Sequence, residues 1–267
     1  SLYPGPLRFA ALFVALAAPL GVRPAGRAEA GSRILSIAAA ADLEPVLVAL
    51  RPTFERGRPG LALRLSYGSS GAFFAQLQSG APFDVFLSAD LAYPRQLVEA
   101  GLAAPQDLFV YARGRLAVWA PQASPIDVEA LGLRAALHPA AKRVAIANPR
   151  HAPYGRAAEA ALRAAGLLDR VRPRLVYGEN VAQATQFVDT GAADLGFIAL
   201  SLALSPALKD RGRIFEVPLD AYPPLEQGGL LLHSAREPEA ARAFRSFLLS
   251  AEAAGLLRRF GFLVEGR

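Results

Sequence analysis

Serine hydroxyls and the backbone N–H groups beside them are the first candidates for chemistry in this sequence. They occur in the stretch Ser66–Ala72, which follows an alternating apolar segment at 61–65 and precedes a helix-like segment that ends at Ser79-Gly80. Ser69 and Ser70 therefore stand at a predicted helix N-terminus, where unpaired N–H groups point outward and can bind an anion. A serine in this place can also simply cap its own helix. Taken alone, the stretch favours the cap.

Similar strand-to-helix junctions recur along the chain, and their recurrence favours an anion site. Besides Ser69-Ser70, the junctions are Ala41-Asp42, Tyr154-Gly155 and Asn180-Val181, so that two fall in each half of the chain. Ligands of open parallel sheets settle beyond the carboxyl ends of the strands, and two junctions per half suit a cleft between two lobes. Each helix N-terminus carries roughly half a positive charge, so four of them would present about +2 to a ligand. This arrangement predicts a small dianion as the guest.

Neutral donors would have to hold this dianion. No Arg or Lys adjoins three of the junctions, and Arg150 and Arg156, which flank the fourth, are predicted to face solvent. Burial of an unpaired dianion is prohibitive unless nearly every oxygen is hydrogen-bonded. Ser70 can donate through its backbone N–H and its hydroxyl, and Tyr154 through its N–H and its phenol.

Composition narrows the classes of function. The chain has 267 residues, of which 53% are hydrophobic, with a formal net charge of +6 and no cysteine. This length supports one bilobed or two small domains, and the lack of cysteine excludes disulfides, thiolate metal sites and thiol nucleophiles. No dense basic run with interleaved aromatic residues occurs, so no nucleic-acid partner is expected. The three histidines show no metal-ligand spacing.

The first thirty residues have the features of an export signal. Arg8 precedes an apolar run over 9–20, and Ala28-Glu29-Ala30 supplies the small-x-small pattern of a cleavage site before Gly31. The run is short for a membrane span, although an uncleaved anchor is an alternative. Residues 1–30 are therefore predicted to be a signal peptide, and the mature protein is expected in the periplasm or otherwise outside the cytoplasm.

Strand-like and helix-like segments alternate over the remaining chain, which predicts an α/β fold with mostly parallel sheets. Two interruptions that contain prolines, near 119–122 and around 218–224, are predicted to be crossings between two lobes. Lobe 1 is accordingly predicted over 31–119 plus 221–267, and lobe 2 over 120–220.

Several motifs together resemble the periplasmic molybdate-binding proteins of ABC transporters. The resemblance runs over nearly all of the mature chain, and its most telling part is Ser79-Gly-Ala-Pro-Phe-Asp84. The motifs that carry it are Ile37–Leu43, Tyr67–Gly71, Ser79–Asp90, Asn148–Gly155, Gly178–Val181, Asp194–Ser201 and Arg259–Phe262. The resemblance implies a type II periplasmic binding fold, in which two α/β lobes joined by two crossings close on a tetrahedral oxyanion. It also implies delivery of the oxyanion to a membrane permease powered by a cytoplasmic ATPase.

Residue by residue, the resemblance places the oxyanion ligands on Ala41, Ser70, Tyr154 and Val181, the last two through their backbone N–H groups. Molybdenum would enter only as the centre of the oxyanion, with no separate metal site. The family often has a serine in place of Ala41 and a tyrosine in place of Ala199, and both hydroxyls are missing here. The phenol of Tyr154 is the candidate to replace the one absent at Ala199.

Asp42 bears on the kind of anion. A carboxylate that faced the guest could accept a proton from hydrogen phosphate, and it would repel a fully ionised dianion. If Asp42 caps its own helix, molybdate, tungstate and sulfate all remain acceptable. Aspartate is a preferred N-cap residue, so the cap is the favoured prediction.

The sequence thus predicts a monomeric, non-catalytic binding protein for molybdate and tungstate that uses no cofactor. A sulfate or phosphate receptor is the alternative within the same class. A secreted serine hydrolase that uses Ser70 would need a base within reach, and the sequence nominates none; the serines also lack a Gly-x-Ser-x-Gly elbow. A regulatory effector-binding domain uses similar lobes, but the predicted leader argues against it.

Overall fold

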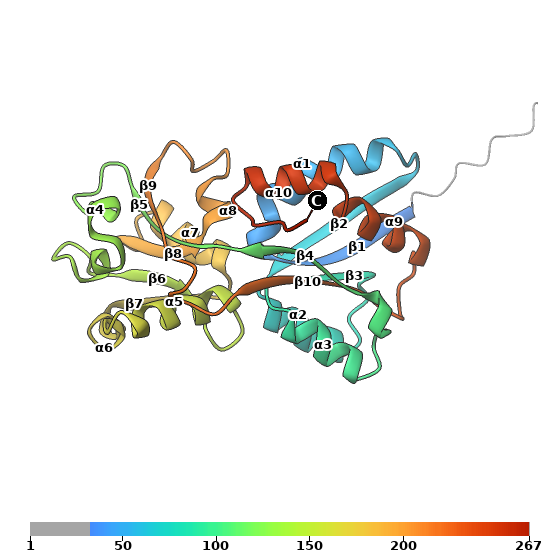
Figure 1. Cartoon of the computed structure of the whole chain (residues 1–267), viewed down its shortest axis with the longest axis horizontal. Coiled ribbons are helices and arrows are strands. Elements are labelled where there is room, and N and C mark those ends of the chain that lie inside the picture. Colours follow the sequence, from blue (N-terminus) through green and yellow to red (C-terminus); the bar gives the residue numbers. More distant parts are fainter. Residues whose placement is uncertain (1–32, 267) are drawn as a thin grey trace, which may run out of the picture. The chain divides into compact units, whose positions relative to one another are not determined.

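The computed structural model describes residues 33–266 and folds them into two α/β lobes (Figure 1). The predicted signal peptide at 1–30 lies outside the described residues. Each lobe is built on one five-stranded sheet that is covered by helices. Among the described residues, no helix has the length and apolar character that a membrane crossing requires.

Lobe 1 consists of the first sheet and its helices. The strands lie in the order β2-β1-β3-β10-β4, and β10 runs antiparallel to both of its neighbours. The strands are β1 (Arg33–Ala40), β2 (Leu61–Gly68), β3 (Val85–Ser88), β4 (Leu108–Gly114) and β10 (Leu225–Leu231). The helices are α1 (Glu44–Arg56), α2 (Ser70–Gln78), α3 (Ala92–Glu99), α9 (Pro238–Leu248) and α10 (Ala251–Arg259), with single 3₁₀ turns at Ala41–Leu43 and Pro105–Asp107.

Lobe 2 repeats this plan with the second sheet. Its strands lie in the order β7-β6-β8-β5-β9, and β5 runs antiparallel to both of its neighbours. The strands are β5 (Leu116–Pro121), β6 (Val144–Ala147), β7 (Leu175–Gly178), β8 (Leu195–Ala199) and β9 (Gly212–Glu216). The helices are α4 (Val128–Leu131), α5 (Pro153–Ala164), α6 (Leu168–Val171), α7 (Val181–Asp189) and α8 (Leu200–Ala203), with 3₁₀ segments at Gly132–Leu137 and Arg172–Arg174.

Four strands of each sheet run in one direction, as the alternation of strands and helices predicts. The fifth strand, β10 or β5, runs the other way because it enters its sheet directly from the other lobe. It therefore enters the sheet at the edge where the parallel strands end, whereas a strand that follows a helical crossover enters at the opposite edge. Each sheet is mixed for this reason.

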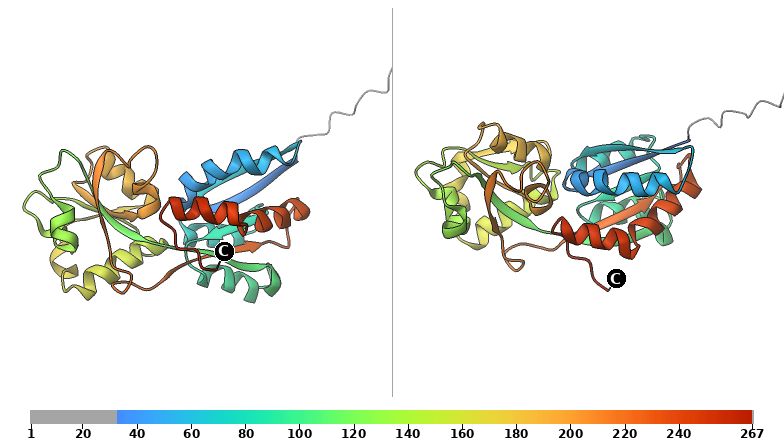
Figure 2. Two further views of the ribbon diagram at one scale, coloured as in Figure 1. Left: turned by 45° about the horizontal axis from the view of Figure 1, so that its top comes forward. Right: turned by 90° about the horizontal axis from the view of Figure 1, so that it is seen from above.

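The two crossings lie side by side between the lobes (Figure 2). The chain first changes sheet between Gly114 and Leu116, because β5 already pairs with β8 and β9 of lobe 2. This point precedes the region 119–122 in which the sequence places the crossing, since Pro121 ends β5 inside lobe 2 instead of leading into it. The chain returns over 217–224, between β9 and β10.

Central strands with helices on both faces have no polar face. Every residue of β3 and of β6 is buried, the pattern expected of such strands. Trp119 of β5 is also buried in the lobe 2 core, which agrees with a packing role. Residue 212 is a glycine, which leaves room for the indole ring, because a Cβ at this position would lie 2.4 Å from the ring.

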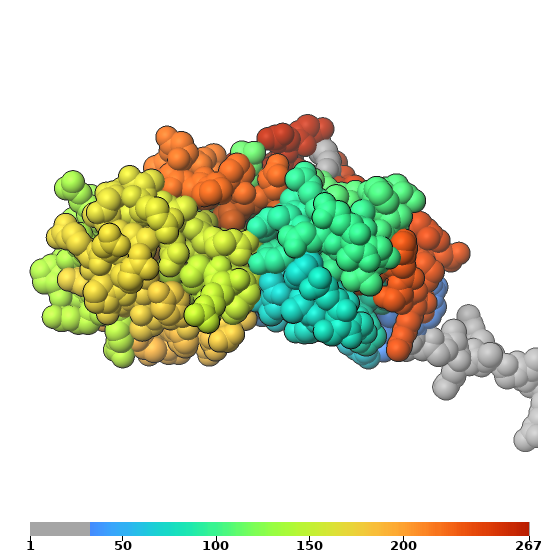
Figure 3. All heavy atoms as spheres, turned by 90° about the horizontal axis from the view of Figure 1, so that it is seen from below, coloured from blue at the N-terminus to red at the C-terminus, as the bar shows by residue number. Residues whose placement is uncertain are grey.

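The segments that follow β1 and β2 face those that follow β6 and β7 across the boundary between the lobes (Figure 1). In the space-filling view, the part of lobe 2 around residue 150 touches lobe 1 near α2, so the lobes are closed on each other at this face (Figure 3). A backbone hydrogen bond of 2.8 Å from Gly71 N–H to the His151 carbonyl joins them there. The fold thus brings the four junctions to one place.

Candidate anion-binding site

The four residues predicted as ligands line a single cavity between the lobes. Ala41, Ser70, Tyr154 and Val181 are all at most 4% exposed. The cavity is small, with a volume of about 10 Å³, which is room for about one water molecule. Its remaining lining residues are Ala40, Asp42, Gly68, Ser69, Ala89, Ala152 and Pro153. The geometry therefore assembles the predicted set, two residues from each lobe.

The first turn of α2 separates the roles of the two serines. Ser69 is the N-cap, and its hydroxyl accepts the N–H of Ala72 at 3.3 Å. Ser70 is fully buried, and its Oγ accepts the N–H of Ala89 at 2.9 Å. Because that oxygen already accepts a bond, its own proton is free to be donated. The predicted cap thus belongs to Ser69, while Ser70 keeps its N–H and its hydroxyl proton for a guest.

Gly71 lets the lobes meet beside this turn. Its N–H donates to the carbonyl of His151, and a Cβ at position 71 would lie 2.7 Å from that same oxygen. A side chain at this position would therefore clash with His151 and push the two lobes away from each other. With the N–H of Gly71 and of Ala72 used in this way, the N–H of Ser70 is the remaining donor of the first turn.

Lobe 2 contributes two further helix starts. Asn180 caps α7 through its Oδ1, which accepts the N–H of Gln183 at 3.0 Å, so Val181 is the first residue of the helix. In α5 the first residue is Pro153, which has no N–H, and the N–H of Gly155 donates to the Ala152 carbonyl at 3.1 Å. Because Val181 and Tyr154 stand in the first turns of their helices, their N–H groups have no acceptor within the helix.

The phenol of Tyr154 does not take the place of the hydroxyl missing at Ala199. Its O–H donates to Oδ2 of Asp42 at 2.9 Å, from lobe 2 to lobe 1, and a phenol has only one proton to donate. Burial and the neighbouring carboxylate raise the pKa of Tyr154 well above its ordinary value. Ala199 is buried and lies outside the cavity lining. Tyr154 therefore faces a guest with its backbone alone.

The predicted N-cap role of Asp42 is wrong. The chain inserts a 3₁₀ turn at Ala41–Leu43 between β1 and α1, so that Asp42 lies within this turn and Leu43 occupies the cap position without a side-chain hydrogen bond. Asp42 is 0% exposed. Burial raises its pKa to about 7, and the hydrogen bond from Tyr154 opposes this rise. Its carboxylate is a contact between the lobes instead of a helix cap.

The described residues that line the cavity include no positive side chain. Among the described lining residues, Asp42 and Tyr154 are the ionisable ones, and no Arg, Lys or His is present. Groups of His, Cys, Asp and Glu that could hold a metal ion are also absent from the described part of the chain. An anion in this space would be held by backbone N–H groups and one hydroxyl.

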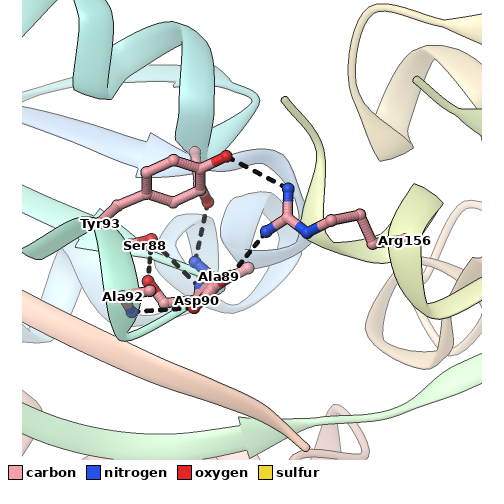
Figure 4. A network of polar contacts seen from close by, with 7 residues as sticks. Ser88, Ala89, Asp90, Ala92, Tyr93 and Arg156 are labelled. Atoms are coloured by element: carbon pink, nitrogen blue, oxygen red, sulfur yellow. Dashed lines mark hydrogen bonds and ion pairs between the residues drawn. The ribbon is translucent and has the colours of Figure 1, made fainter. Parts of the chain in front are cut away.

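Arg156 of α5 approaches the site from outside the cavity. The sequence predicts that it faces solvent, but its guanidinium pairs with the Asp90 carboxylate of lobe 1 at 2.6 Å and donates to the Tyr93 hydroxyl at 3.2 Å (Figure 4). Asp90 lies one residue after Ala89, whose N–H donates to Ser70. Arg150 is exposed, as predicted. The contact of Arg156 was missed because nothing in the local sequence links 156 to 90.

Two further contacts between the lobes escaped sequence reasoning. The Ser69 hydroxyl and Nδ1 of His151 lie 2.8 Å apart, and the Ser201 hydroxyl donates to the Asp42 carbonyl at 2.6 Å. The imidazole is thus placed against the capping serine and not against Ser70. A hydrolase that uses Ser70 as nucleophile has no support here, since the partner of its Oγ is a backbone N–H.

Comparison with known proteins agrees with this geometry. Residues 35–263 match the family model of the bacterial extracellular solute-binding proteins. The molybdate-binding protein ModA of Rhodobacter capsulatus is 38% identical over 78% of this chain and 80% of its own length. ModA of Azotobacter vinelandii is 35% identical over 94% of this chain and 96% of its own length. The structure of the Azotobacter vinelandii periplasmic molybdate-binding protein superposes with a TM-score of 0.81 at 32% identity, covering 87% of this chain and all of that one.

The chain therefore belongs to the bacterial extracellular solute-binding proteins and, within them, to the ModA group. Its fold is the type II periplasmic binding protein fold that the motifs imply. The family consists of binding proteins and not of enzymes, in agreement with the prediction of a non-catalytic protein.

Proposed function

We propose that this protein captures molybdate, and tungstate with it, in the cavity between its lobes and delivers the oxyanion to an ABC permease. The observation that carries the proposal is the cavity itself. Ser70, Tyr154 and Val181, whose N–H groups have no acceptor within their helices, line one buried space together with the turn at Ala41, and no cation is among the described residues of its lining. A doubly charged, tetrahedral anion uses such a shell well, because each oxygen can accept bonds from neutral donors and the helix termini supply partial positive charge.

The family places the protein outside the cytoplasm, and the finer picture is part of the proposal. Residues 1–30 act as the export signal that is removed before Gly31. The mature protein works as a monomer, because one chain supplies both halves of the cavity. Closure of the lobes around the guest creates the surface that the permease recognises.

A sulfate or phosphate receptor remains the alternative within the class. Both anions are tetrahedral, and hydrogen phosphate carries a proton that it would donate to an acceptor. The first-turn N–H groups around the cavity donate and suit a fully deprotonated guest, whereas the Asp42 carboxylate in the lining is an acceptor that hydrogen phosphate could satisfy. Of the two side-chain hydroxyls among the four residues, only that of Ser70 is left for the guest, because the phenol of Tyr154 donates to Asp42. Selection between anions therefore depends chiefly on the radius of the shell of N–H groups.

Calorimetric titration of the purified protein with molybdate, tungstate, sulfate and phosphate tests the assignment. We expect molybdate and tungstate to bind with similar affinity and sulfate at least about tenfold more weakly, a difference of about 1.4 kcal/mol. Sulfate binding as tight as molybdate binding would overturn the choice of substrate. A protein that binds none of the four anions would overturn the proposed function altogether.

A further inference from the structure

A buried carboxylate shares the cavity with the proposed anion site. Asp42 is fully buried and lines the same space as Ser70 and Val181. One carboxylate oxygen, Oδ2, accepts the hydroxyl of Tyr154, while Oδ1 is buried without a hydrogen-bond partner. An anion receptor that keeps an uncompensated negative charge beside its guest needs a physical explanation.

No cation offsets the charge of Asp42, although Tyr154, the Gln227 side chain and the backbone N–H groups of Asp42 and Leu43 each lower its pKa. The hydrogen bonds to its side chain and carbonyl come from Tyr154 of α5 and Ser201 of α8, both neutral hydroxyls. The 3₁₀ turn also packs against α1, α7 and β2. Glu44 of α1 is exposed, and burial raises the pKa of Tyr67 of β2 to about 12. None of these groups is positively charged.

The tyrosines beyond this first layer are neutral as well. Tyr111 of β4 donates to Oε1 of Gln227 at 3.1 Å, and a Cβ on Gly114 would lie 2.3 Å from the Tyr154 hydroxyl and 2.8 Å from Nε2 of Gln227. Burial raises the pKa of Tyr111 and of Tyr154 well above the ordinary value. At the first crossing, Arg113 and Arg115 act on Tyr222, a further neighbour of Tyr154, and they lower the pKa of Tyr222.

Two negative groups in one dry space repel strongly, and a carboxylate relieves such repulsion by taking up a proton. We propose that the cavity takes up one proton together with its dianion, and that Asp42 holds this proton. The inference rests on the proposed function, since it needs an oxyanion in the cavity. The proton comes from the solvent and forms an O–H bond with the unpartnered Oδ1, so that Oδ2 keeps the hydrogen bond from Tyr154.

The direction of the pH dependence follows from the sign of this linkage. In the ligand-free protein, burial raises the pKa of Asp42 from 3.8 to about 7 despite the hydrogen bonds that lower it. A dianion in the same cavity raises it further, because it favours the neutral form of the acid. Between pH 7.5 and 9 the free protein has to gain the proton on binding, so its affinity falls as the pH rises. The slope approaches tenfold per pH unit when one proton is taken up.

Titration calorimetry with molybdate at pH 8, in buffers of different ionisation enthalpy, measures the protons taken up per molybdate bound. We expect uptake close to one proton for the natural protein and none for Asp42→Asn. Asn keeps the size of the side chain and an oxygen that accepts the bond from Tyr154. The affinity of Asp42→Asn should be independent of pH from 7.5 to 9 and at least about tenfold tighter than the natural protein at pH 9.

The matched control is Glu44→Gln, which removes an exposed carboxylate two residues away and should keep the proton uptake. Tyr154→Phe provides a second, independent test. Loss of its hydrogen bond raises the pKa of Asp42, so the drop in affinity should move to higher pH. Molybdate binding with no proton uptake in the natural protein would overturn this inference and leave the proposed function intact, whereas no molybdate binding at all would overturn the function.

Discussion

The two halves of the cavity are built from different chemistry. Lobe 1 lines the cavity with two polar side chains, the hydroxyl of Ser70 and the carboxylate of Asp42, besides the backbone N–H of Ser70, whereas lobe 2 offers only the backbone N–H groups of Tyr154 and Val181 for a guest. Both lobes use the same strand order and both place helix N-termini at the boundary. The two lobes share one strand order, yet a substitution affects their donors differently. Side-chain donors are lost by truncation, while backbone donors are lost only to proline.

The largest expected effect concerns the carboxylate in the half contributed by lobe 1. A group whose pKa is raised on folding contributes stability below its unfolded pKa and loses it as the pH rises through the folded pKa. For Asp42 this window runs from 3.8 to about 7. Three pH units correspond to up to about 4 kcal/mol. Asp42→Asn should therefore stabilise the ligand-free protein at pH 8 and have little effect near pH 4, as measured by urea unfolding.

Asp84 is the matched carboxylate for this comparison. It is also buried, but its oxygens accept the N–H groups of Ser36, Arg236 and Glu237 at 2.6 to 3.2 Å. Asp84→Asn should lower the stability at pH 8 by about 1–3 kcal/mol, because an amide nitrogen cannot accept these bonds. Equal effects of the two substitutions at pH 8 would contradict the view that Asp42 is uncompensated.

The next effect tests the backbone half. Val181→Pro removes the N–H at the first position of α7, where proline is well tolerated. The preceding Asn180 has φ −149° and ψ 175°, an extended conformation that suits a residue before proline. Loss of one bond to a charged oxygen should weaken molybdate binding by about 3 kcal/mol, or roughly 150-fold.

Val181→Ala is the control for this substitution, because it truncates the side chain and keeps the N–H. Its affinity for molybdate, measured in the same calorimetric titration, should stay close to that of the natural protein. If the proline and alanine variants bind equally well, Val181 is not a backbone donor to the anion.

Ser70→Ala tests the side-chain half and should cost about 1–3 kcal/mol of binding free energy, because it removes a hydroxyl donor to a charged group. The neighbouring Ser69→Ala serves as the comparison. It removes the cap of α2 and should lower thermal stability by about 1 kcal/mol while changing affinity less. An affinity that is unchanged in Ser70→Ala would exclude the Ser70 hydroxyl from the site.

The smallest effect is expected at the ion pair between the lobes. Arg156 and Asp90 are partly exposed, with side-chain exposures of 39% and 32%, so solvent screens their attraction. Arg156→Gln should speed molybdate release by no more than about fivefold, or about 1 kcal/mol, as followed by stopped-flow displacement. Arg163, which pairs with Glu159 within α5, supplies the control. Arg163→Gln should leave the release rate unchanged, and an equal effect of both variants would contradict a role of Arg156 between the lobes.

The helix starts of the site could be predicted because their signals are local. Ser69, Pro153 and Asn180 are residue types that favour a helix N-terminus, and each stands at the start of α2, α5 or α7. Buried apolar runs such as Val85–Ser88 likewise mark central strands. These local signals predicted helix starts in both halves of the chain and suggested a cleft between two lobes, whereas the particular ligand residues came from the resemblance to the molybdate-binding proteins.

The remaining features depend on contacts between distant parts of the chain. Aspartate is a residue type that favours an N-cap. Only the packing of lobe 2 against Asp42 shows that its side chain instead accepts a hydrogen bond from Tyr154, 112 residues away. The pairing of Arg156 with Asp90 spans 66 residues. The first crossing was placed too late because prolines mark the end of β5 as well as they would mark a crossing. Local sequence patterns do not show which distant residue a side chain will contact.

The central claim is that neutral donors from four turns, two in each lobe, surround the oxyanion without a cation. A crystal structure of the molybdate complex, with molybdenum located by its anomalous scattering, tests it most directly. We expect one molybdenum peak in the cavity, with oxygens within about 3 Å of the N–H groups of Ser70, Tyr154 and Val181. A peak elsewhere, or an arginine or lysine side chain bonded to the anion, would contradict it.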